Sequence, residues 1–101
     1  MTEIERSFEA ELIDKMQRAK KECKYNPTRF NQMLARYGGV GTAKRLIQSG
    51  IATGQTSDGF GTLCLWSRLD LTMEDSVCKL EYRSLFTSEE IDYCKELLGK
   101  K

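Results

Sequence analysis

The chain has 101 residues, of which 40% are hydrophobic and 31% are charged, and its formal net charge is +1 at pH 7. This length suits one domain with one core, and the composition argues against both a disordered tail and a membrane protein. The chain contains no histidine, the side chain that most often acts as a general base or zinc ligand near neutral pH. We expect a single domain over residues 1–101, with no catalytic residues, no metal or cofactor, and no small-molecule substrate implied.

Four cysteines are spread along the chain, at positions 23, 64, 78 and 94. They lack the short spacing that brings zinc ligands together, and nothing indicates a secreted protein that would need disulfides. The first six residues carry acidic side chains where a secretory signal would carry basic ones. No stretch is long and apolar enough to span a bilayer. We expect reduced thiols, a cytoplasmic location and no membrane contact.

The N-terminal segment, residues 1–24, is predicted to form a long amphipathic helix. Thr2 and Glu5 have the spacing of a capping box, and acidic side chains in the first half are followed by basic ones, as the helix dipole favours. Apolar residues recur every three or four positions, which predicts one apolar stripe. The stripe consists of Ile4, Phe8, Leu12, Met16, Ala19 and Cys23.

A helical core is predicted over residues 27–98. Asn26-Pro27 is typical of a helix start, and Gly38-Gly39 is expected to end that helix. The next helix is expected from about Val40 to Ser49, with Gly50 as its stop, followed by a loop.

Three further helix starts follow in the second half of the chain. Their caps are Ser57 or Asp58, then Thr72 with Asp75, then Thr87 with Glu90, where Phe86 is placed to pack on Ile91. No segment alternates with period two, so we predict an all-α compact bundle of about six helices with essentially no sheet. The side chains expected on buried faces include Phe30, Phe60, Cys64, Trp66, Cys78, Phe86 and Cys94.

Two motifs have an ordinary structural interpretation. The glycine-rich stretch from Gly38 to Lys44 resembles a phosphate-binding loop, but it lacks a preceding strand and Lys-Ser or Lys-Thr at the required place, so a helix corner is favoured. An anion such as a nucleic-acid phosphate could still bind its amides. Carboxylates near residues 70–75 and 89–92 fall at predicted helix starts, where negative charge is favoured without any function.

The charge distribution carries the functional prediction. Residues 15–45 hold nine basic side chains and one acid, Glu22, whereas both flanking segments are acidic. This pattern is typical of a phosphate-binding surface, with Tyr25 and Tyr37 available for stacking, but it also fits cations that only neutralise the acidic flanks. The candidate nucleic-acid-binding residues are Lys20, Lys21, Lys24, Arg29, Arg36, Lys44 and Arg45.

The alternative function is a protein contact. The long first helix could pair with a copy of itself or lie in the groove of a partner, as in an adaptor, a dimerisation unit or a phage-type inhibitor. Binding to phosphates should weaken steeply with salt, whereas an apolar helix interface should not.

From residue 27 to residue 98, about 70% of the chain resembles a small bacterial helical domain of unassigned function. That domain occurs alone or near the C-terminus of longer proteins, some of them restriction-like or helicase-like. The resemblance implies a single helical domain and an association with nucleic acid or phage conflict, but it implies no mechanism. The matching elements are Arg29-Phe30 with Met33-Leu34, Gly38-Gly39 with Ala43-Lys44 and Leu46, Gly59-Phe60 with Leu63, Arg68-Leu69-Asp70-Leu71-Thr72 with Glu74, and Tyr82-Arg83 with Leu85-Phe86-Thr87 and Glu90.

Overall fold

The computed structural model describes residues 1–99, with the backbone alone at position 58, and these residues form helices and connecting turns without a strand. The predicted all-α class is confirmed; residues 100–101 of the expected domain lie outside the described part. One helix, α2, bends at Gly38, so five α-helices give six α-helical segments. The elements are α1 (Glu3–Glu22), α2 (Thr28–Thr53), α3 (Asp58–Leu65), η1 (Leu69–Leu71), α4 (Met73–Val77), η2 (Leu80–Leu85) and α5 (Ser88–Leu97), where η denotes a 3-10 helix.

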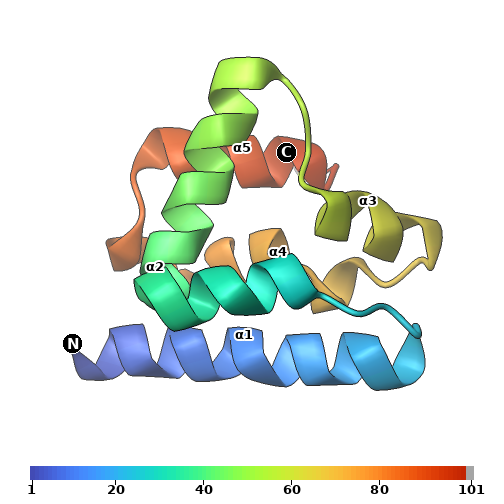
Figure 1. Cartoon of the computed structure of the whole chain (residues 1–101). Coiled ribbons are helices and arrows are strands. Elements are labelled where there is room, and N and C mark those ends of the chain that lie inside the picture. Colours follow the sequence, from blue (N-terminus) through green and yellow to red (C-terminus); the bar gives the residue numbers. More distant parts are fainter. Residues whose placement is uncertain (100–101) are drawn as a thin grey trace.

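The first helix, α1, lies along one side of the molecule, and the first segment of α2 runs back over it (Figure 1). Its predicted capping box is present, because Glu5 N donates to Thr2 Oγ1 at 3.2 Å and Thr2 N donates to Glu5 Oε1 at 3.0 Å. The apolar stripe is buried within the chain itself, with Phe8, Leu12 and Ala19 at 0% exposure. The stripe therefore forms part of the core of this domain.

The bend in α2 explains the glycine pair. Gly38 has φ 74° and ψ 177°, a conformation that costs glycine little but strains other residues. A side chain on Gly39 would place its Cβ 2.7 Å from Cα of Glu9, so glycine allows α2 to approach the backbone of α1. Gly39 N also donates to Glu9 Oε1 at 2.8 Å. The predicted helix end at this pair is thus a sharp turn between two helical segments.

The predicted stop at Gly50 is wrong. The helix continues to Thr53 and ends at Gly54, which has φ 74°. Gly50 is buried inside α2, and a Cβ there would lie 2.0 Å from the Tyr93 hydroxyl of α5. Glycine at this position makes room for the tyrosine, a requirement set by the packing of α5 on α2.

Two apolar clusters form the core, and α1 contributes to both. In the larger cluster, the Phe8 ring meets the rings of Tyr82 and Phe86 edge-on, with centroid distances of 5.2 Å each. The smaller cluster joins the second half of α1 to α3 and η1 through Met16, Ala19, Cys23, Leu63 and Leu71. Edge-to-face aromatic pairs add to the free energy gained from burial.

The predicted caps in the second half of the chain are confirmed. Thr72 Oγ1 accepts from Asp75 N at 3.2 Å, Thr87 Oγ1 accepts from Glu90 N at 3.1 Å, and Ser57 caps α3. Among residues 1–99, no helix is both long and apolar enough to cross a membrane.

Two side chains predicted to be buried face the solvent. Trp66 is 50% exposed, and Cys64 is exposed as well. The reason is that α3 ends at Leu65, and the chain then turns through Ser67 with φ 59°, so Trp66 leaves the helical face. Leu80, which begins the 3-10 helix η2, is 81% exposed as well.

Candidate functional site

The cations of residues 15–45 do not form one surface. Three of them are held in ion pairs: Lys15 with Asp75 at 3.1 Å, Arg18 with Glu22 at 3.2 Å, and Lys44 with Glu90 at 2.8 Å. Lys15 is also 5% exposed, and its Nζ donates to Thr72 O at 3.0 Å. Burial lowers the pKa of Lys15, and Asp75 opposes this effect only in part. Lys15 is therefore a structural cation.

Lys44, one of the seven candidate residues, is engaged in packing α2 against α5. Its partner Glu90 is 2% exposed and also completes the capping box of α5. Burial would raise the pKa of Glu90, but hydrogen bonds from Lys44, the Thr87 backbone and Gln48 together hold it below its ordinary value. The Lys44 ammonium additionally lies 5.3 Å from the centroid of the Phe86 ring.

Four candidate residues, Lys20, Lys21, Lys24 and Arg29, lie exposed where α1 ends and α2 begins; we call them the basic corner. None of the four forms an ion pair with the side chains that the structure describes. The only nearby acid in the sequence, Glu22, accepts from Arg68 at 2.7 Å and from Arg18 at 3.2 Å.

These two hydrogen bonds to Glu22, from Arg68 first and then from Arg18, hold the pKa of its carboxyl below its ordinary value. The carboxylate is thus already matched by two arginines. Because Glu22 is already paired with Arg68 and Arg18, the positive charge of the basic corner remains available to an external anion.

The remaining two candidates, Arg36 and Arg45, stack on Tyr37 at the bend of α2. The guanidinium carbon of Arg45 is 3.8 Å from the ring centroid and that of Arg36 is 5.4 Å away. We call these three residues the kink cluster. The bend packs at Glu9 of α1, twelve residues before Lys21, so the kink cluster and the basic corner are about 18 Å apart along α1.

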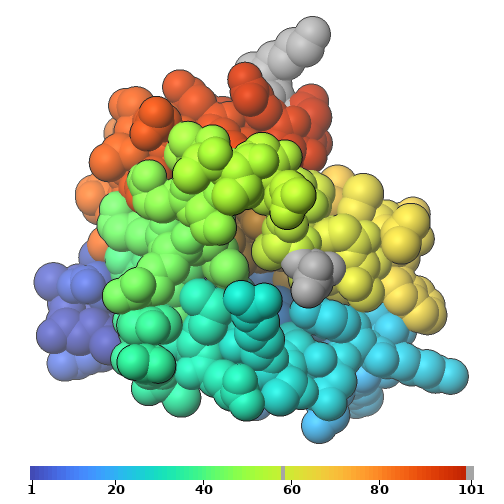
Figure 2. Space-filling model, turned by 45° about the horizontal axis from the view of Figure 1, so that its top comes forward, coloured from blue at the N-terminus to red at the C-terminus, as the bar shows by residue number. Residues whose placement is uncertain are grey.

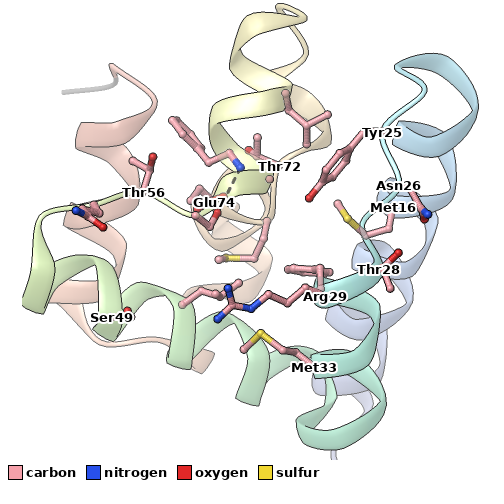
Figure 3. A pocket seen from close by; sticks show the side chains of 18 of the residues that line it. Met16, Tyr25, Asn26, Thr28, Arg29, Met33, Ser49, Thr56, Thr72 and Glu74 are labelled. Carbon is pink, nitrogen blue, oxygen red and sulfur yellow. Dashed lines mark hydrogen bonds between the residues drawn. The ribbon is translucent and has the colours of Figure 1, made fainter.

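A pocket of about 470 Å³ opens beside the basic corner, and we call it the central pocket. Figure 2 looks onto the face where the start of α2 (cyan), the end of α2 (green) and α3 (yellow) meet around it. Its walls combine hydroxyl and amide groups with aromatic rings and methionines. Arg29 of α2 and Glu74 of α4 both extend into it (Figure 3).

Glu74 is the functional candidate that the sequence interpretation missed. It occupies the first turn of α4, as a capping acid would, yet it is only 4% exposed. Burial raises its pKa to about 7, and the hydrogen bond from its own backbone N–H and the charge of Lys15 oppose this only in part. One signal was present: Leu71 and Val77, three residues away on either side, are apolar and buried.

No three His, Cys, Asp or Glu side chains lie close enough to hold a metal ion in the described part of the chain. Comparison with models of protein families finds no match. Comparisons with curated proteins and with solved structures also find no match.

Proposed function

We propose that the protein binds nucleic acid without catalysis, and that the basic corner contacts the phosphate backbone. The observation that carries the proposal is the absence of ion pairs between Lys20, Lys21, Lys24 or Arg29 and the described carboxylates, although these four exposed cations lie at one helix junction. Clustered cations of this kind gain free energy when they displace the counterions of a phosphate backbone. Contacts to the backbone alone do not imply sequence readout.

The kink cluster supplies a second contact in this proposal. Stacking on Tyr37 orients the Arg36 and Arg45 guanidinium groups while both side chains stay exposed. Arginine fixed in this way loses less conformational entropy when it binds a phosphate. A strand that reaches from the basic corner to the kink cluster would follow the first segment of α2.

The test is the anisotropy of labelled single-stranded DNA, duplex DNA and RNA, titrated with the protein over a series of salt concentrations. The corner variant combines Lys20→Gln, Lys21→Gln and Lys24→Asn; asparagine is chosen because residue 24 has φ 53°. Three lost phosphate contacts should make the slope of log K against log salt shallower by about 2 to 3.

The matched control combines Arg6→Gln, Arg83→Gln and Lys95→Gln. These exposed cations lie outside residues 15–45, and their removal changes the net charge from +1 to −2, as in the corner variant. The control should keep the slope of the unmodified protein. An equal loss of affinity in both variants would show that binding depends on net charge alone. No binding at low salt would refute the proposal.

A second candidate function is a contact with protein through the exposed apolar residues, because the apolar stripe of α1 is already buried. Leu65 is 89% exposed and Leu80 is 81% exposed. Light scattering at high salt would detect self-association through these residues. A dimer that the Leu65→Ser and Leu80→Ser changes convert to a monomer would support this candidate, and a monomeric unmodified protein would exclude a homodimer.

A further inference from the structure

The central pocket has the size and the walls of a site for a small planar molecule. Its volume of about 470 Å³ falls within the roughly 300 to 1,000 Å³ that is usual for such sites. Tyr25, Phe30 and Phe60 contribute aromatic rings to its lining. Aromatic side chains stack on unpaired nucleobases, and each stacked base contributes about 1 to 3 kcal/mol.

Glu74 provides a hydrogen-bonding group on the wall of this pocket. The two oxygens of an ionised carboxylate can accept two parallel N–H bonds. Guanine presents two neighbouring N–H donors on one edge, at N1 and at the 2-amino group. Adenine and cytosine instead place a single amino donor beside an acceptor on the same edge, so an ionised Glu74 matches guanine best.

Arg29 brings a positive charge to the same pocket from the first turn of α2 (Figure 3). A guanidinium binds phosphate oxygens through two parallel hydrogen bonds. The charge that acts on Glu74 comes from Lys15, which is held by Thr72 O and Asp75. Arg29 forms no ion pair with a described carboxylate, so its guanidinium is available to a ligand phosphate, while Glu74 is available to the base.

We infer that the central pocket binds one guanine nucleotide, with the edge of the base on Glu74 and the phosphate on Arg29. The nucleotide is either free or an unpaired member of a strand held by the basic corner, since Tyr25 directly follows Lys24 in the chain. Only the binding of a nucleotide that belongs to a strand rests on the proposed function.

The experiment is calorimetric titration of the full chain, at about pH 8.5 so that Glu74 is ionised, with guanosine monophosphate, inosine monophosphate, adenosine monophosphate and guanosine. Guanosine monophosphate should bind, and inosine monophosphate, which lacks the 2-amino group, should bind about tenfold more weakly. Glu74→Gln should weaken guanosine monophosphate binding about tenfold and remove the preference over inosine monophosphate. Arg29→Gln should weaken guanosine monophosphate binding but leave guanosine binding unchanged.

Several outcomes would overturn the inference. These are no binding of guanosine monophosphate, equal binding of adenosine monophosphate, or no effect of either substitution. Both variants should remain folded, because Arg29 is exposed and Glu74→Gln removes a buried charge.

The corner variant separates this inference from the proposed function. It should keep its affinity for guanosine monophosphate while losing affinity for oligonucleotides, because Lys20, Lys21 and Lys24 do not line the pocket. Nucleotide binding without any oligonucleotide binding would refute the proposed function and leave the pocket assignment standing. The affinities of two oligonucleotides, one with a single unpaired guanine and one without, are then compared. A higher affinity for the first would show that the pocket binds a guanine within a strand, and equal affinities would indicate a free nucleotide.

Discussion

Replacing Glu74 with glutamine should stabilise the protein at alkaline pH. The carboxyl has a pKa raised from 4.5 to about 7 by burial. Below pH 4.5 the folded and unfolded states both carry the proton, so burial of this carboxyl has no electrostatic cost. Between pH 4.5 and 7 only the unfolded state releases it, and the free energy of unfolding falls by about 1.4 kcal/mol per pH unit. Above pH 7 the cost is constant at about 3 kcal/mol.

Urea unfolding of the two proteins, followed by circular dichroism at about pH 5 and about pH 8, measures this cost. Several other carboxyls, including Glu11, Glu22 and Asp70, have lowered pKa values and contribute the opposite pH dependence. The difference between the variant and the unmodified protein cancels their contributions. It should be small at the lower pH and approach about 3 kcal/mol at the higher one.

Glu96→Gln is the matched control, since it removes a carboxylate from the exposed surface of α5. We expect it to change the free energy of unfolding by less than about 0.5 kcal/mol at either pH. A Glu74→Gln difference that does not grow with pH, or a variant less stable than the unmodified protein at the higher pH, would refute the account of Glu74 as a buried and poorly compensated carboxyl.

The remaining predictions concern packing and reactivity. Lys15→Ala should lower the free energy of unfolding by about 2 to 4 kcal/mol in urea titrations, because it removes a buried cation together with its bonds to Thr72 O and Asp75. Gly50→Ala should lower the thermal midpoint through its clash with Tyr93, whereas Gly61→Ala, which meets no atom within 4 Å, should stabilise α3 by about 0.5 to 1 kcal/mol; the opposite order would contradict the α2–α5 packing. A thiol reagent should modify exposed Cys64 first and Cys94 last, since burial raises the pKa of the Cys94 thiol, and mass spectrometry would show the order.

The features predicted correctly from the sequence depend on neighbours within about one helical turn. The cap at Thr2 needs only Glu5, and the cap at Thr87 needs only Glu90, so their spacing is sufficient to identify them. Gly50 has the composition of a helix stop, and its actual role depends on Tyr93, which no local pattern reveals.

The candidate site could be predicted only in part, for the same reason. Net charge along the chain identified residues 15–45, but Lys44 meets its carboxylate partner 46 residues away, so the sequence could not show that this cation is engaged. Periodicity could have placed Glu74 on a buried face. It could not show that a pocket formed by α2, α3 and α4 opens beside that face.

The polar contacts of α1 also bear on the synthesis of the chain. Glu11 accepts from Ser76, from Lys79 at 3.0 Å and from Tyr82 at 3.2 Å, partners that lie 65 to 71 residues later in the sequence. Translation takes about 4 to 14 seconds to add that length of chain. Until then α1 has neither these partners nor Phe86 for its apolar stripe. The core to which α1 contributes is therefore completed only after residues 76–86 have been synthesised, although α2 can pack on α1 earlier.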